Sequence, residues 1–287
     1  MMKYAIYSAL IGDYDTILQP AVVDEDFDYF IFSNDIHTDK VGVWNILPID
    51  YINGDSVKIA RWVKTHPEDL LPEYEATLWI DANIQINSSA LYSRFHELHS
   101  NPLTLISAIV HPKFDCIYEE MFYLLLNHYE HENVILDWGH KLYKEHYPRH
   151  NGTAETGLLY RRQCDQTASM NKIWWDAIEQ FSRRDQLSFY YALWKAGITN
   201  RAFFDDGTTV RNNNAVKYYC HNNSSGKYII WKKDEAWLCR YTERNPDKTK
   251  TISDLYYWII STSYPLLWAK LLGMYFRVMD VIHRTFK

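Results

Sequence analysis

Short apolar segments alternate with longer helical ones along most of the chain. This order predicts an α/β fold, in which ligands bind at the carboxyl ends of the strands. The predicted strands are Lys3–Ala9, Tyr29–Ser33, Trp44–Leu47, Leu78–Ile86, Leu103–Val110 and Gly157–Arg161. The predicted helices are Ser56–Thr65, Ala90–His99, one or two over Cys116–Leu142, Gln166–Phe181 and Gln186–Ala196.

The strand predicted over Leu78–Ile86 carries the clearest indication of chemistry. Asp81 and Asn83 interrupt its apolar residues, two positions apart. Because an unpaired buried carboxylate costs several kcal/mol, Asp81 is expected where the strand ends and meets a cation. Alternation along a strand would point both side chains to one side, where their oxygens suit a hard metal ion. A strand-end Asp that caps a turn explains the same residues equally well.

Composition limits the class of protein. The 287 residues are enough for one large domain, or for one domain with an appendage. A net charge of −6 argues against nucleic acid as a partner, because binding it needs a basic surface. The four cysteines are widely spaced, which indicates neither a zinc site nor a disulfide framework. The chain starts in a strand without a signal-peptide core, so we expect a cytoplasmic protein.

The predicted helix Ser56–Thr65 carries a cation at every third position. Lys58, Arg61 and Lys64 therefore share about a third of the helix circumference. A cationic face of this kind suits a sugar diphosphate. A solvated surface stripe is the usual explanation of such spacing and stays open as the alternative.

Acidic residues near two predicted helix starts are candidates for the chemistry. Asp115 and Glu119 are predicted on one helical face, where a carboxylate beside a sugar can act as base or nucleophile. The alternative is an acidic first helical turn, in which the carboxylates only interact favourably with the helix dipole. Asp185 precedes another helix, and an N-cap alone would explain it.

Four ordered motifs give the chain a family resemblance. They are LWIDANIQI from Leu78, HPKFDCIYEE from His111, AETGLLYRR from Ala154 and MNKIWWDAIEQFSRRDQLSF from Met170. Together they resemble the domain-of-unknown-function 616 family, which is glycosyltransferase-like and known in bacteria and plants. The similarity runs from YSALIGDYD near the amino terminus to about Tyr191. It implies a GT-A type, Rossmann-like nucleotide-sugar fold.

More distantly, the layout resembles retaining family 8 glycosyltransferases. This resemblance implies a base-binding first strand, here ending at Ala9 and Gly12, and a helix start with an Asp-Gln pair, which makes Gln186 a donor contact. It implies Mn²⁺ or Mg²⁺ held against the donor diphosphate by the Asp81 segment, and a UDP-sugar is the favoured donor. Asn83 stands where a stricter pattern has Asp, so metal is expected to bind together with the diphosphate.

The same resemblance implies a third metal ligand and the reacting groups. His221 begins the stretch HNNSSGK, whose spacing differs from the His-x-x-Gly-x-x-Lys element of family 8. His221 is the predicted third ligand. The candidates near the reacting carbon are Glu155 and Asp185, with Asp115 and Glu119 next.

The C-terminal part is predicted as a helical tail over residues 251–287, after a transferase domain over residues 1–250. Leu255–Ala269 has no charged residue and is too short and polar to span a bilayer. Its aromatic residues, followed by Lys270, Arg277, Arg284 and Lys287, fit a helix that lies on an anionic membrane surface. Packing on the domain, or in a homodimer, is the alternative.

These features predict a metal-dependent hexosyl- or pentosyltransferase acting on a bacterial surface polysaccharide or a lipid-linked glycan. It is expected in the cytoplasm, peripherally on the inner face of the cytoplasmic membrane. A non-catalytic glycan-binding or scaffold protein on the same fold is one alternative. A metal-dependent hydrolase or phosphotransferase is another.

Overall fold

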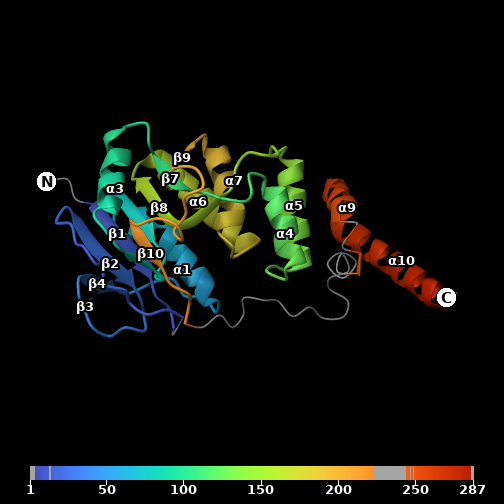
Figure 1. The fold of residues 1–287 in the computed structure, drawn as a ribbon, viewed down its shortest axis with the longest axis horizontal. Helices are drawn as coiled ribbons and strands as arrows, with labels where there is room; N and C mark the ends of the chain where they lie inside the picture. The colour runs from blue at the N-terminus through green and yellow to red at the C-terminus, as the bar shows by residue number, and fades with distance from the viewer. Residues whose placement is uncertain (1–3, 13, 223–243, 246, 248, 286–287) are drawn as a thin grey trace. The chain divides into compact units, whose positions relative to one another are not determined.

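The computed structural model describes residues 4–12, 14–222, 244, 245, 247 and 249–285 (Figure 1). The chain forms two compact units. The first contains Met1–Asp115 and Gly152–Ser224, and the second contains Cys116–Asn151 and Ser225–Lys287. This division differs from the predicted one at residue 250, because the helices after Cys116 group with the C-terminal helices. That residues 1–250 act as one domain stays a prediction.

A mixed sheet forms the centre of the first unit. Strands β1 (Tyr4–Ala9) and β5 (Ala76–Ile80) run parallel, and β8 (Ala154–Arg162) is antiparallel to β5. The predicted α/β class is therefore confirmed. The strand order is β3-β4-β2-β1-β5-β8-β7-β9, with β2 at Phe27–Phe32, β3 at Lys40–Val41, β4 at Trp44–Leu47, β7 at Ile106–Val110 and β9 at Asn200–Ala202.

Hydrophobic cores lie on both faces of this sheet. Successive residues of β5 enter different cores, as the pleat of a strand requires: Leu78 joins the core that contains Phe95, and Trp79 joins the core that contains Trp174. Strands buried on both faces read as continuous apolar runs. The helices of this unit are α1 (Ser56–Thr65), α2 (Pro67–Leu70), α3 (Ala90–Ser100), α6 (Asp165–Gln180) and α7 (Gln186–Ala196).

Helix α1 begins and ends where the sequence predicts. Asp55 is its N-cap, and the Asp55 carboxylate accepts a hydrogen bond of 2.9 Å from the backbone N–H of Val57. The helix stops at Thr65 because His66 precedes Pro67, and a residue before proline disfavours helical geometry. These local signals fix the bounds of α1.

The strand predicted over Leu78–Ile86 is broken in the structure. β5 ends at Ile80, and residues 81–83 turn the chain, with the N–H of Ile84 donating to the carbonyl of Asp81. β6 (Ile84–Ile86) then pairs with β10 (Val216–Tyr218) in a separate two-stranded sheet. The prediction that strand alternation aligns Asp81 with Asn83 is therefore wrong. The expectation that Asp81 lies at a strand end is correct.

The second unit is helical where the structure describes it. Within it, Gly139 of α5 lets α9 approach, because a Cβ at Gly139 would lie 2.9 Å from the hydroxyl of Tyr256. None of the described helices is long and apolar enough to cross a membrane. The helices are α4 (Ile117–Leu126), α5 (Glu132–Lys144), α9 (Thr249–Ser261) and α10 (Pro265–Thr285).

Candidate active site

The carboxylate of Asp185 is the centre of a buried polar cluster in the first unit. Its Oδ2 accepts hydrogen bonds from Lys64 Nζ at 2.5 Å and from Thr156 Oγ1 at 2.7 Å. Its Oδ1 lies 3.1 Å from Arg61 Nε. Burial alone would raise the pKa of Asp185, but the charges of Arg61 and Lys64 hold that pKa well below its ordinary value. Asp185 is therefore a buried anion.

The simple capping explanation of Asp185 is wrong. Asp185 occupies the N-cap position of α7, yet its side chain makes no capping hydrogen bond. Its backbone carbonyl, rather than its carboxylate, accepts from Ser188 N and from Trp174 Nε1. The carboxylate is turned inward to the cations of α1 because two charges there need a partner.

The three predicted cations of α1 have different surroundings. Lys64 is fully buried, and its ammonium also lies 3.8 Å from Asp81 and over the ring of Trp79. Burial lowers the pKa of Lys64, and Asp185 opposes that shift. Arg61 keeps a partly exposed side chain, whereas the Lys58 ammonium donates to the carbonyl of Glu179. The expected open cationic face is therefore reduced to Arg61.

Asp81 lies directly after β5, beside the same cations. Its Oδ1 accepts a 2.7 Å hydrogen bond from Trp79 Nε1 and lies 3.9 Å from Arg61 Nη1. Across from it on β8, Gly157 leaves room for the carboxylate, because a Cβ there would lie 3.2 Å from Asp81 Oδ2. The side chain of Asp81 is partly exposed.

Glu155 lies at the start of β8, one residue before Thr156. Its Oε1 accepts a 2.8 Å hydrogen bond from Arg211, whose guanidinium also stacks over the ring of Tyr218. The other carboxylate oxygen, Oε2, is buried and makes no hydrogen bond among the residues described. Buried carboxylate oxygens normally have partners, so this atom is poised to accept a proton or a hydroxyl.

His221 is held by a carboxylate rather than by the Asp81 turn. The Nδ1 of His221 lies 2.9 and 3.0 Å from the two oxygens of Asp15, and its ring packs on Tyr14 with centroids 4.4 Å apart. Asn83 is buried and donates from Nδ2 to the carbonyl of Tyr219 at 2.8 Å. Residues 223–227 of the predicted HNNSSGK element lie outside the described residues.

A different Asp-x-Asp-His group is present at the amino ends of the strands. One ligand atom from each of Asp24, Asp26 and His96 lies within 4.8 Å of the others. Asp26 precedes β2, which runs parallel to β1, and β1 runs parallel to β5. This group is therefore at the opposite edge of the sheet from Asp81.

The loop after β1 contacts the loop after β2. The sequence predicts that the nucleobase of the donor binds at this edge of the sheet. Gly12 has a φ of +66° and donates its N–H to Asp35 Oδ2 at 2.6 Å. Ala9 is buried at the end of β1. A hollow at this edge is lined by Ser8, Leu10, Ile17, Trp44, Asp81 and Ala82. The hydroxyl of Ser8 is buried and has no hydrogen-bond partner in the described residues.

The remaining predicted residues are Gln186 and Asp115 of the first unit and Glu119 of the second unit. Gln186 is the first residue of α7 and donates from Nε2 to the carbonyl of Ala154. Asp115 lies before α4, which begins at Ile117, so Asp115 and Glu119 do not share a helical face. Glu119 is exposed in the first turn, 3.8 Å from Arg149. The acidic-first-turn alternative fits Glu119.

Three residues of the cluster, Thr156, Trp79 and Trp174, were not predicted from the sequence. Thr156 stands next to the predicted Glu155, and Trp79 stands two positions before Asp81. In β8, alternate residues face one side of the sheet, so Thr156 points away from Glu155 and toward α1 and α7. That alternation was the available signal.

A family comparison decides the class of protein. The model of the TOD1/MUCI70 glycosyltransferase-like domain matches residues 2–221, which is more than half of the chain. The chain belongs to this family. The matched residues of this TOD1/MUCI70 domain include the whole Asp185 cluster and end at His221. A glycosyltransferase-like assignment is thereby confirmed, while the resemblances to the domain-of-unknown-function 616 and to family 8 stay predictions.

Solved structures similar to this chain include three glycosyltransferases. One, a glycosyltransferase involved in the glycosylation of the major capsid of PBCV-1, has 13% identity and a TM-score of 0.37 over 62% of this chain and 80% of that one. The galactosyltransferase LgtC has 10% identity and a TM-score of 0.41, over 88% and 95%. Mouse xyloside xylosyltransferase 1 has 6% identity and a TM-score of 0.40, over 80% and 99%. No curated protein sequence matches the chain.

Proposed function

We propose that this protein transfers a sugar from a nucleotide-sugar donor, with a UDP-sugar favoured, to a glycan acceptor on a GT-A type fold. The observation that carries the proposal is the ionised Asp185, buried with Lys64 and Arg61 beside Asp81 at the carboxyl end of β5. Carboxyl ends of strands are where α/β proteins bind ligands. The family match supports the transferase class.

The kinds of ligand atom that Asp81, Asn83 and His221 offer are those that a divalent metal takes. Asp81 offers a carboxylate oxygen, and Asn83 offers its amide oxygen because its nitrogen is used by Tyr219. Asp15 holds Nδ1 of His221, which leaves Nε2 as the donor atom; such carboxylate–histidine pairs are usual around metal ligands. This mixed set suits Mn²⁺ better than Mg²⁺, which avoids nitrogen ligands. A bound metal would neutralise the charge that develops on the leaving diphosphate.

Arg61 is the protein cation best placed to share that task. Its side chain is partly exposed, whereas Lys64 is enclosed by two carboxylates and two indole rings. An interaction that strengthens as charge develops lowers the barrier rather than only the binding energy. Asp185 fixes the direction of the Arg61 guanidinium, so the charge is held in place before the donor arrives.

Glu155 is the residue proposed to act on the hydroxyl of the acceptor. Its unpaired Oε2 can take the proton of an acceptor hydroxyl, and the hydrogen bond from Arg211 to Oε1 orients the carboxylate. Asp185 cannot easily do this, because all its oxygens are engaged by cations and by Thr156. The finer predictions, namely a bacterial surface polysaccharide or a lipid-linked glycan as acceptor and a hexosyl or pentosyl donor, belong to this proposal.

The proposal predicts a nucleotide preference that a thermal-shift screen detects. UDP with Mn²⁺ at a hundred times its Kd should stabilise the protein by about 2.7 kcal/mol. Arg61→Ala should weaken UDP binding roughly tenfold or more, since a hydrogen bond to a charged group contributes about 1.5–3 kcal/mol. Lys58→Ala is the matched control on the same helix and should bind like wild type. Wild-type UDP affinity in Arg61→Ala would show that the stripe is only a solvated surface.

Glu155→Gln is expected to lower turnover about a hundredfold with little change in stability, because general acid–base groups contribute on this scale. The control is Arg211→Met, which removes the partly exposed ion pair but keeps the carboxylate. Steady-state kinetics on both variants separate the two roles. If Glu155→Gln and Arg211→Met lose activity equally, Glu155 serves only to pair with Arg211.

Helix α10 carries an exposed stripe of apolar side chains. Leu267, Leu271, Met274 and Val278 follow one another at helical spacing and are all exposed. Lys270 and Arg277 flank the stripe on one edge. Apolar side chains beside cations match an anionic bilayer surface, so we propose peripheral association with the inner face of the cytoplasmic membrane. A homodimer interface is the competing occupant.

Full-length protein is expected to float with phosphatidylserine vesicles at low salt and to be released at high salt. The double variant Lys270→Glu/Arg277→Glu should not float, because each cation near such a surface contributes about 1 kcal/mol. The control, Lys172→Glu/Lys217→Glu, makes the same charge change at exposed positions elsewhere. Flotation by both variants, or a wild-type dimer that ignores vesicles, contradicts membrane association.

A further inference from the structure

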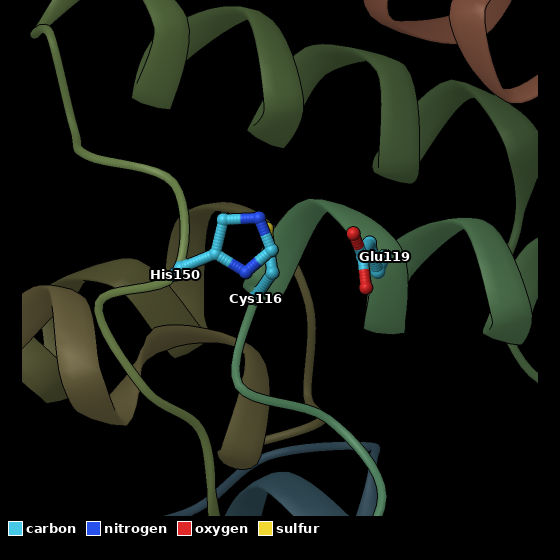
Figure 2. A group of neighbouring side chains, drawn as sticks. All are labelled: Cys116, Glu119 and His150. Atoms are coloured by element: carbon cyan, nitrogen blue, oxygen red, sulfur yellow. The ribbon is translucent and has the colours of Figure 1, made fainter.

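We propose that the second unit holds a transition-metal site formed by Cys116, Glu119 and His150. One ligand atom from each of the three side chains lies within 4.8 Å of the other two. Figure 2 shows the imidazole of His150 beside the start of α4, from which Cys116 and Glu119 come. The ion that fits this set is Zn²⁺, because thiolate, imidazole and carboxylate are its preferred ligands.

The three ligands come from the two ends of one helical pair. Cys116 is the N-cap of α4, Glu119 lies in its first turn, and His150 follows α5. The wide spacing of the four cysteines therefore hides the site, since only one cysteine takes part and its partners are not cysteines. A bound ion would link residue 116 to residue 150 and so hold the two ends of this segment together.

The side chains differ in burial in a way that suits an ion at the edge of this unit. Cys116 is fully buried and is not in a disulfide. Glu119 and His150 are exposed, so both can swing by the short distance that coordination needs. Tetrahedral zinc with bonds of about 2.0–2.3 Å sets its ligand atoms roughly 3.5 Å apart. The three protein ligands leave one coordination position for water.

The backbone at His150 fits the ligand role. Its φ is +53°, in the left-handed region that few residues other than glycine adopt, although His, Asn and Asp are enriched there. Such geometry costs free energy and is kept where a side chain has to be aimed. His146 has a φ of +58° in the same unit and belongs to no such group of ligands among the described residues, which makes it a matched control.

Arg149 is the residue that metal binding would displace. Its Nη2 lies 3.8 Å from Glu119 Oε1, and its guanidinium packs over the ring of Tyr257. The ion pair is largely exposed, so replacing it with a metal–carboxylate bond costs little. The thiol of Cys116 must lose its proton to bind, so zinc uptake releases a proton to solvent.

Cobalt titration of the full chain tests the site without depending on transferase activity. Co²⁺ bound to a thiolate gives a sulfur-to-metal charge-transfer band, which the oxygen and nitrogen ligands near Asp81 cannot give. A variant with Cys164, Cys220 and Cys239 changed to Ser keeps Cys116 as its single thiol. This variant should bind one equivalent of Co²⁺ with that band, and Zn²⁺ should displace it.

Changing a ligand should weaken Zn²⁺ binding more than about a hundredfold, since loss of a residue that only orients a ligand costs about 10–100-fold. His150→Asn and Glu119→Gln test this at exposed positions and should leave the fold intact; Asn tolerates the left-handed backbone. Cys116→Ser in the single-thiol background should abolish the band. His146→Asn should bind like wild type. No stoichiometric band in the single-thiol protein, or equal Zn²⁺ affinity in His150→Asn and His146→Asn, overturns the site. Because the site lies outside the proposed transferase residues, neither result bears on sugar transfer.

Discussion

Asp185→Asn is expected to lower the free energy of unfolding by about 3–5 kcal/mol, the usual cost of leaving a buried charge without its partner. Lys64 Nζ is fully buried and lies 2.5 Å from Asp185, so it loses its closest anion. A capping role predicts almost no change in the free energy of unfolding, because Asn replaces Asp at an N-cap at almost no cost. Urea unfolding of the two proteins measures the difference.

The double variant Lys64→Met/Asp185→Asn separates the ion pair from other effects of the substitution. With no buried ammonium left unpaired, it should be more stable than Asp185→Asn alone, and the cycle should give a coupling of several kcal/mol. Both proteins should lose transfer activity, since Arg61 is no longer held. If the double variant is as unstable as the sum of the single ones, Lys64 and Asp185 do not act as a pair.

Acid should lower the stability of the wild type, because it protonates the Asp185 carboxylate. The pKa of Asp185 is lower in the folded state than its ordinary value of 3.8. Its contribution to stability is therefore complete above pH 3.8 and is lost as the pH falls below that value toward the folded pKa. Acid unfolding of Asp185→Asn should lack this component.

The sequence predicted best what local signals determine. The bounds of α1 follow from the N-cap Asp55 and from Pro67, and the C-terminal end of α7 follows from Gly197, whose φ of +66° suits glycine. The α/β class followed from the alternation of apolar strands and helices. Asp81 was predicted at a strand end because a buried carboxylate needs a partner, and its cations are there.

The sequence could not predict which distant residues meet. Lys64 of α1, Thr156 of β8 and Asp185 are brought together only by the tertiary fold, so Asp185 looked like an ordinary N-cap. The continuous apolar run over Leu78–Ile86 hid the turn at 81–83, because β6 pairs with a strand far along the chain. The Asp15–His221 contact joins residues from opposite ends of the family match for the same reason.

Asp81→Asn is expected to lower turnover at least about a hundredfold while the fold stays intact. Loss of one charge-stabilising group costs roughly 10²–10³ in turnover. Asn keeps an oxygen for the hydrogen bond from Trp79 and fits the space beside Gly157, so the turn after β5 is preserved. Only the negative charge is removed.

If Asp81 holds the metal, Asp81→Asn should also change how UDP binding depends on Mn²⁺. UDP affinity should fall in the presence of Mn²⁺ and stay unchanged in its absence, as measured by calorimetry. Asn83→Asp should instead tighten Mn²⁺ binding without nucleotide, since a carboxylate is the stronger ligand. Asp26→Asn is the matched control, because Asp26 belongs to the acidic group at the opposite edge of the sheet. Wild-type turnover in Asp81→Asn, or an equal loss in Asp26→Asn, would show that the carboxyl end of β5 is not the place where the donor diphosphate is held.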